Sequence, residues 1–458
     1  VFEYFKTAGY LGFPWGLMAY PLTPLLPLVQ IADITGVWGI SFLSVLFQAV
    51  LAETVLVLFH LRVEPAVLPR RLAKRGGKVS YRKLISSPVR PIARDFTFPR
   101  LYLFERRRIR SSGRTAGGSV VGRPGSVGIP NDRPAAIPKW NWNQWTAVAA
   151  LIVVCIGYGS FRLGTQIPVK AEIEAVMVQQ NIDSWLSGNE VESLRIGQRL
   201  TREALDAAET PVDVVMWSET SFRRPFDAYY SFYQEHPAED PFTSFLEEID
   251  TYLFLGSPQR HPERDGGYMN AVILLDSERG ILNLYGKQHP VPFAEHVPFW
   301  ELERVRRFFQ NAVGLYSAGW TLGKEYTIFS LPLNSGKTVT FGAPICFEDA
   351  FPYINRRFVL SGADLPINLT NDSWSRRDSA QTQHFLAAYF RAIENRRVLV
   401  RSTNAGVSAV IDAYGNVLYS MPFFEEAALQ CTIPVQKEEK LTFYTRFGDY
   451  FPYLLMVF

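Results

Sequence analysis

The first 61 residues are mostly apolar, and their pattern changes along the segment. No charged residue occurs from Gly9 to Ala32, but prolines at positions 14, 21, 24 and 27 exclude one straight helix. We therefore expect broken structure at membrane depth or at the interface, where protein or a water-filled cavity covers the backbone. The run from Gly36 to Leu61, interrupted by Glu53, is long enough to cross a bilayer because roughly 20 apolar residues suffice.

Two further apolar runs occur later in the chain. The run from Trp145 to Phe161 approaches the lower length limit of a membrane span. The C-terminal stretch from Tyr450 to Phe458 has the composition expected at the start of another span. We interpret these runs as membrane segments, and buried core helices are the alternative.

Residues 62–143 lie between the two candidate spans and differ from them in composition. The segment is strongly basic, and its later part contains a run rich in Gly, Pro and Ser. Such a composition buries little apolar surface, and we predict disorder. The basic residues favour a cytoplasmic loop over a nucleic-acid-binding arm, because flanking Lys and Arg tend to keep a loop in the cytoplasm. Crossing the second span then puts residue 165 onward on the opposite, outer side.

The remaining residues have the alternating strand and helix patterns of an α/β domain. A helical pattern over 379–397 places Leu386, Phe390 and Ile393 on one face, and Asp412–Gly415 is typical of a hairpin turn. The expected strands are 175–181, 212–217, 252–257, 270–276, 338–345, 363–369 and 399–412. We predict membrane segments in 1–61, the basic insert in 62–143, a transmembrane helix in 144–164, the α/β domain in 165–440 and the start of a membrane segment in 441–458.

Composition narrows the chemistry of this 458-residue chain. The three cysteines, Cys155, Cys346 and Cys431, are too few and too scattered for a disulfide framework or a zinc site. No cluster has metal-ligand spacing and no Gly-rich phosphate loop follows a strand, so we expect no metal and no other cofactor. The chain begins with Val rather than Met, and we expect a fragment of a longer protein.

Three motifs, each at the end of an apolar strand-like run, contain residues suited to acyl transfer: Met216–Thr220, Tyr285–Glu295 and Pro344–Asp349. A cysteine is a nucleophile as its thiolate, a carboxylate can take the proton of the thiol, and an ammonium can stabilise an oxyanion. Each of these residue types alone has an ordinary explanation as a surface charge or an inert core thiol. Their occurrence together in this order favours a catalytic site.

The order Glu–Lys–Cys in WSET, YGK and CFED resembles the nitrilase superfamily. The resemblance implies an α-β-β-α sandwich with Cys346 as nucleophile, Glu219 as general base and acid, and Lys287 as electrostatic stabiliser. It also implies that Glu295 supports the triad and that Glu348 lies near the nucleophile.

Finer motifs are similar to one branch of this superfamily, the apolipoprotein N-acyltransferases. They are Lys287–Pro298, Asn371–Trp374, Gln383–Phe385, Arg391–Glu394, Arg401–Val407, Gly12–Trp15 and Gln30–Gly39. The resemblance implies a nitrilase-like sandwich attached to transmembrane helices, with an incomplete membrane domain because the family has more spans before the Gly12–Trp15 element. The long basic insert differs from the short connection expected there.

The resemblance also implies a ping-pong reaction through a Cys346 thioester, with a phospholipid as acyl donor and the diacylglyceryl-cysteine of an apolipoprotein as acceptor. It implies a bacterial inner-membrane enzyme in contact with membrane lipids, with its catalytic domain on the periplasmic side. Trp185, Phe347 and Trp374 are candidates for substrate binding, although ordinary packing also explains the two tryptophans. For His289 and His384, structural hydrogen bonding is favoured over proton transfer.

Two other functions remain open from the sequence. A membrane-tethered amidase would use the same triad to hydrolyse a small amide, but it would need no Gly12–Trp15 element. A non-catalytic membrane scaffold with a decayed nitrilase domain would be expected to lack Glu219, Lys287 or Cys346, and all three are present.

Overall fold

The computed structural model describes residues 1–58, 142–183, 189–226, 242–262, 267–276, 280–314, 319–437 and 440–457. The predicted disorder of the basic insert therefore falls outside the described residues, apart from Trp142 and Asn143 at its end. Trp185 also lies outside them.

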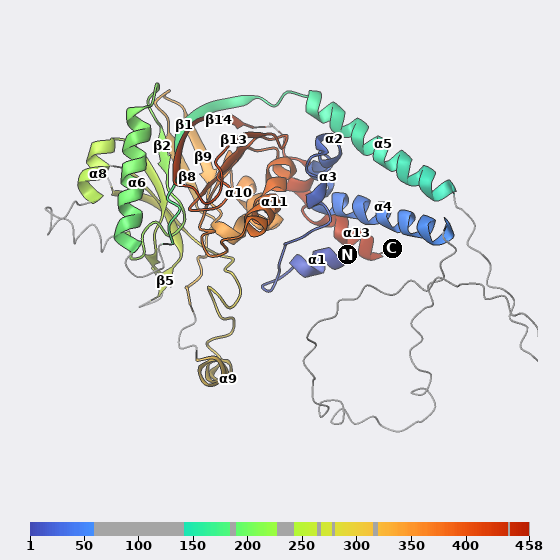
Figure 1. The fold of residues 1–458 in the computed structure, drawn as a ribbon, viewed down its shortest axis with the longest axis horizontal. Coiled ribbons are helices and arrows are strands. Elements are labelled where there is room, and N and C mark those ends of the chain that lie inside the picture. Colours follow the sequence, from blue (N-terminus) through green and yellow to red (C-terminus); the bar gives the residue numbers. More distant parts are fainter. Residues whose placement is uncertain are drawn as a thin grey trace, which may run out of the picture. The chain divides into compact units, whose positions relative to one another are not determined.

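Two six-stranded sheets form the centre of the fold (Figure 1). The first has the order β14 (Ala427–Gln436), β1 (Val169–Gln179), β2 (Val214–Met216), β3 (Tyr252–Gly256), β6 (Ala271–Asp276) and β7 (Gly280–Gly286). The second has the order β13 (Val417–Ser420), β12 (Ala409–Ile411), β11 (Leu399–Thr403), β10 (Leu365–Thr370), β9 (Thr338–Gly342) and β8 (Ile328–Pro332). A separate hairpin pairs β4 (Gln259–Arg260) with β5 (Tyr268–Met269).

Helices cover the outer face of each sheet (Figure 1). Successive residues of a strand point to opposite faces, and β1 follows this rule with apolar residues on both sides. Ala175 and Met177 join the core between the sheets, whereas Val176 and Val178 pack toward α6 (Asn189–Asp206) and α8 (Phe242–Ile249). The second sheet packs against α10 (Pro352–Leu360) and α11 (Asp378–Asn395). The predicted α-β-β-α sandwich is confirmed.

Parallel pairing at the centre of each sheet brings the ends of the predicted motif strands together. β1, β2 and β3 are parallel, and so are β9, β10 and β11. The chain leaves the carboxyl end of β2 toward Glu219 and the carboxyl end of β9 toward Cys346. Ligand sites of α/β proteins commonly lie at such strand ends.

The N-terminal segment forms short helical elements, in agreement with the predicted broken structure, and two of its prolines lie in the first turn of such an element. These elements are α1 (Phe2–Thr7), η1 (Tyr20–Leu22), α2 (Leu26–Val29) and α3 (Ala32–Thr35). Two long helices, α4 (Val37–Leu58) and α5 (Trp142–Gly164), are long and apolar enough to cross a membrane. Only 22% and 17% of their most apolar windows is buried, so most of their apolar surface lacks protein cover in the described structure. The remaining helices are α9 (Glu303–Phe308), η5 (Phe309–Val313), η6 (Cys346–Ala350), α12 (Phe443–Phe447) and α13 (Tyr450–Val457).

A buried ionic cluster attaches this N-terminal segment to the sandwich. Asp33 of α3 accepts hydrogen bonds from Arg396, at the end of α11 (2.8 Å), and from the Tyr158 hydroxyl of α5 (2.8 Å). Arg162 of α5 lies 3.0 Å from the same carboxylate. A buried carboxylate needs such cationic partners because its desolvation costs several kcal/mol. One side chain thus connects a candidate span, the N-terminal turns and the sandwich.

A close backbone contact between α2 and α5 generates a stability prediction. A Cβ added to Gly159 would lie 1.6 Å from the Pro27 carbonyl oxygen, whereas a Cβ added to Gly157 meets nothing within 4 Å. We expect Gly159→Ala to lower stability by about 1–3 kcal/mol, because the helices must separate. Gly157→Ala is the matched control, since it makes the same helix-propensity change without the collision. Thermal unfolding in phospholipid micelles measures both, and equal unfolding temperatures would contradict the contact.

Candidate active site

The structure brings Glu219, Lys287 and Cys346 into one buried site. Lys287 follows β7, and its ammonium lies 2.8 Å from Glu295 Oε1 and 3.4 Å from Glu219 Oε1. Lys287 is 2% exposed and Glu219 is 4% exposed, so water screens their charges little. The Asn270 side-chain amide donates to Glu219 Oε1 (2.7 Å) and Glu295 Oε1 (3.3 Å). The Lys287 ammonium thus contacts two carboxylates, those of Glu219 and Glu295.

Backbone N–H groups fix the second oxygen of each carboxylate. The Asn371 N–H donates to Glu219 Oε2 (2.9 Å), and the Val291 N–H donates to Glu295 Oε2 (2.7 Å). Backbone donors of this kind cannot rotate away, so both carboxylates are pre-oriented. Preorganised groups are what charge stabilisation in a transition state requires.

Cys346 begins η6 with a backbone conformation that is uncommon for its residue type. Its φ angle is 48°, in the left-handed region that side chains with a Cβ seldom occupy. Thr220, next to Glu219, also has a positive φ of 59°. Such strained residues concentrate at functional sites. Both proposed reacting groups therefore lie in or beside a strained turn.

Burial raises the pKa of the Cys346 thiol well above its usual range, Glu219 adds to this effect, and Lys287 opposes it. The thiol is therefore protonated near neutral pH and needs a base to become a nucleophile. Burial acts to lower the pKa of Lys287, but Glu295 and Glu219 raise that pKa well above its usual value. The ammonium is consequently charged throughout the physiological pH range.

Glu348 ties the lysine segment to the cysteine segment. Its Oε1 accepts the backbone N–H groups of Gln288 (2.8 Å) and His289 (2.9 Å), and its Oε2 accepts the N–H of Ile345 (2.8 Å). The Tyr285 hydroxyl donates to both oxygens. Burial raises the pKa of Glu348 to about 7, although the backbone donors act in the opposite direction. The predicted proximity of Glu348 to the nucleophile is explained by this bridging position.

The three aromatic residues predicted to bind substrate have different environments. Phe347 is buried beside the nucleophile, where its ring packs 5.4 Å from that of Trp15. Trp374 is 67% exposed, and Trp185 lies outside the described residues. Their roles in substrate binding stay predictions. The Trp15 contact was missed, although the Gly12–Trp15 element was recognised.

His289 and His384 both take part in hydrogen bonds. His289 Nδ1 lies 2.6 Å from the Tyr353 hydroxyl. Burial lowers the pKa of His289 to about 4, and the charge of Lys287 adds to this effect. That imidazole is therefore neutral at physiological pH. His384 lies between two aspartates, Asp372 and Asp349, that were not among the predicted site residues.

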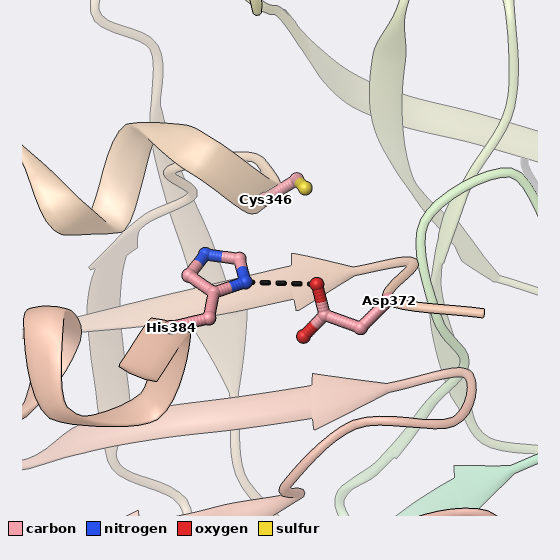
Figure 2. A group of neighbouring side chains, drawn as sticks. All are labelled: Cys346, Asp372 and His384. Carbon is pink, nitrogen blue, oxygen red and sulfur yellow. Dashed lines mark hydrogen bonds and ion pairs between the residues drawn. The ribbon is translucent and has the colours of Figure 1, made fainter. Parts of the chain in front are cut away.

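Figure 2 shows Asp372 and His384 joined by a hydrogen bond beside the Cys346 thiol. The atoms of these three residues that could bind a metal ion, namely the thiol sulfur, a carboxylate oxygen and a ring nitrogen, lie within 4.8 Å of one another. No other group of three His, Cys, Asp or Glu side chains is placed in this way among the described residues. Both ring nitrogens of His384 already face carboxylates, and the cations of Lys287 and Arg401 lie in the same site. These contacts favour an ionic cluster over a metal centre.

The chain matches two protein-family models and is similar to several curated proteins. The family model described as carbon-nitrogen hydrolase matches residues 164–441, and the model described as apolipoprotein N-acyltransferase N-terminal domain matches residues 1–50. "Apolipoprotein N-acyltransferase 2" of Treponema denticola is 41% identical over 313 residues, which cover 68% of this chain and 59% of that protein. "Apolipoprotein N-acyltransferase 2" of Treponema pallidum is 36% identical over 329 residues (67% and 58%), and "Apolipoprotein N-acyltransferase" of Borreliella burgdorferi is 32% identical over 281 residues (61% and 52%). The chain thus spans less than two thirds of the length of these relatives.

The bridging carboxylate generates a prediction for the site. At about pH 8 most Glu348 side chains are ionised, because the pKa is about 7. At this pH we expect Glu348→Gln to lower the free energy of unfolding by about 2–4 kcal/mol. The glutamine NH₂ group would replace one carboxylate oxygen, and it would face backbone N–H groups that now donate to that oxygen.

Denaturant unfolding of the two proteins measures the loss. Glu247→Gln removes the charge of an exposed glutamate and is the matched control, with little effect expected. If Glu348→Gln were as stable as this control, Glu348 would not hold the two segments together.

Proposed function

We propose that this chain, which belongs to the carbon–nitrogen hydrolase family, is the catalytic part of an apolipoprotein N-acyltransferase. Its reaction moves a fatty acyl group from a phospholipid to the α-amine of a diacylglyceryl-cysteine. The observation that carries the proposal is the buried Lys287 ammonium between Glu219 and Glu295, beside the Cys346 thiol. The match of residues 1–50, the names of the relatives and the two candidate spans support the membrane part of the proposal.

In the first half-reaction, Glu219 takes the proton of the Cys346 thiol as the sulfur attacks the ester carbonyl of the phospholipid. Negative charge develops on the carbonyl oxygen, and the fixed Lys287 ammonium stabilises it. The carbon–oxygen ester bond then breaks, and Glu219 returns the proton to the departing alkoxide. The products are a Cys346 thioester and a lysophospholipid.

In the second half-reaction, the lipoprotein amine attacks the thioester carbon. Glu219 takes a proton from the amine, and Lys287 again stabilises the oxyanion. The carbon–sulfur bond breaks, the sulfur recovers its proton from Glu219, and the amide product leaves. Glu219 thus acts as a general base and then as a general acid in each half-reaction, as a ping-pong reaction requires.

The N-terminal segment supports the choice of a lipid substrate over a small amide. Phe13 and Trp15 stack with each other (5.1 Å), and both pack near Phe347, which follows the nucleophile. The same segment continues through α3 into the candidate span α4. The nucleophile therefore borders an aromatic surface that leads toward the membrane helices, and such a surface also keeps water from a thioester.

We place the protein in a bacterial inner membrane with the catalytic domain on the periplasmic side. The basic composition of residues 62–143 supports this orientation, because positively charged loops tend to stay in the cytoplasm. The acyl chain enters past Phe347, with Trp185 and Trp374 as further contacts. No cofactor is required by the steps above.

Intact-mass spectrometry of the purified chain in phospholipid micelles tests the proposal. We expect a hydroxylamine-sensitive mass increase of one fatty acyl chain, and Cys346→Ser should show no thioester of this kind. Adding a diacylated lipopeptide should then discharge the adduct and yield an N-acylated peptide.

A folded chain that gains no acyl mass from phospholipid would overturn the acyltransferase proposal. Hydrolysis of a small amide by that same preparation, lost in Cys346→Ser, would instead favour the membrane-tethered amidase.

A further inference from the structure

Four buried charged residues form a cluster behind the nucleophile, and none of them is needed for the reaction steps above. They are Asp349 of η6, Asp372 after β10, His384 of α11 and Arg401 of β11. Each is at most 2% exposed. Burying uncompensated charges costs several kcal/mol per ion, so such a cluster must balance its own charge.

Both ring nitrogens of His384 face a carboxylate. Its Nδ1 lies 2.8 Å from Asp372 Oδ1, and its Nε2 lies 3.1 Å from Asp349 Oδ1. A neutral imidazole can donate from only one nitrogen, and its other lone pair would face a carboxylate. The imidazolium donates from both nitrogens, so the contacts on the ring are those of the doubly protonated form.

The charge count of the cluster agrees with this assignment. Arg401 donates to Asp349 Oδ2 and lies 3.8 Å from Asp372 Oδ2. Two carboxylates then face two cations, and the cluster is neutral. With a neutral His384, one excess negative charge would remain buried.

The cluster lies beside Cys346 and next in sequence to a residue that holds Glu219. Asp349 lies three residues after Cys346 in the same short helix, and the donor atoms of Cys346, Asp372 and His384 are within 4.8 Å of one another. Asp372 follows Asn371, whose N–H holds the Glu219 carboxylate. The charge of Asp372 also raises the pKa of Cys346. Its effect is smaller than those of burial and Glu219, which raise this pKa, and that of Lys287, which lowers it.

Trp15 covers the open face of the ring. Its indole lies 5.1 Å from the imidazole centroid with an angle of 33° between the ring planes. A cation over an aromatic face is attracted by the ring quadrupole, which favours the imidazolium further. The residue that packs on Phe347 therefore also packs on His384.

We propose that His384 is a positioning residue of the site. Held as an imidazolium between Asp349 and Asp372, it balances their charge beside Cys346. It also fixes the helix that carries Cys346 and the segment whose Asn371 N–H holds the Glu219 carboxylate. The inference rests on the proposed function only in taking Cys346 as the nucleophile. It gives the nucleophile a further nearby cation, on the side of the second sheet, in addition to Lys287 and Arg401.

The test measures the thiol itself, by the rate at which iodoacetamide alkylates Cys346 as a function of pH. The alkylated peptide is quantified by mass spectrometry in the full chain in micelles, with Cys346→Ser as the blank. Alkylation follows the thiolate fraction and needs no lipid substrate, so its outcome is separable from that of acyl transfer.

Charge balance predicts effects of opposite sign. His384→Gln leaves an excess negative charge and should slow alkylation at about pH 7.5 by about tenfold, equivalent to an upward shift of about one pKa unit. Asp372→Asn leaves an excess positive charge and should speed alkylation by a similar factor. The double variant restores neutrality and should return within about threefold of the wild-type rate.

A purely structural histidine would give slower alkylation in all three variants, or no change in His384→Gln, and either result would overturn the proposal. Circular dichroism and thermal unfolding check that each variant folds. If His384→Gln does not fold, His384→Asn removes the same charge and is measured in its place, and unchanged alkylation in that variant would overturn the proposal.

Discussion

The buried ammonium of Lys287 is the interaction on which the rest of the site depends. A charged group with almost no exposure is tolerated only where opposite charges and hydrogen bonds replace its hydration. Glu219 and Glu295 supply the charges, and Asn270 and two backbone N–H groups hold the carboxylates in turn. Positions at the ends of β2, β6 and β7 are thereby fixed relative to one another. The same carboxylate that neutralises Lys287 is the one available to deprotonate the thiol.

The proposed nucleophile, Cys346, is held from both sheets by two neighbouring residues of η6. Glu348 accepts hydrogen bonds from the segment after β7, on the side of the first sheet, and Asp349 contacts His384 and Arg401 on the side of the second. Adjacent side chains of a short helix point in different directions, so one turn can bridge two layers. The positive φ of Cys346 is maintained by these contacts, because a strained residue persists only where its surroundings determine its conformation.

Residue patterns within short stretches of the sequence predicted individual helices and turns correctly. The helix expected over 379–397 is α11, with Phe390 and Ile393 on its buried face, and the expected turn at Asp412–Gly415 joins β12 to β13. The run 399–412 was predicted as one strand and is two, because the chain reverses after β11 and returns antiparallel as β12. Gly406 in that reversal has no room for a side chain, since a Cβ would lie 2.5 Å from Asp372 Oδ2.

Motif order predicted which residues gather in the site, but not how their charges are arranged. Glu219, Lys287 and Cys346 could be found because they occur in this order in motifs that resemble the nitrilase superfamily, each after an apolar strand-like run. The partners of His384 could not be found this way, since Asp349 and Asp372 are 35 and 12 residues away and no periodicity links them. The contact of Asn270 with Glu219 could not be predicted for the same reason, because Asn270 is a single polar residue before β6 and belongs to no motif.

The arrangement also suits the proposed reaction, in which a reactive thioester must be kept from water. The thiol is protonated at rest, because burial and Glu219 raise its pKa. In the proposed mechanism it reacts only when a substrate carbonyl and the base are both in place. The proposed thioester could be lost by hydrolysis, and Phe13, Trp15 and Phe347 form an aromatic surface next to Cys346 in the chain. Trp15 also packs on His384, so the segment that excludes water contacts the cluster that holds the nucleophile. Displacing the N-terminal segment would therefore loosen the charge network and admit water together, which makes that segment a structural part of the site.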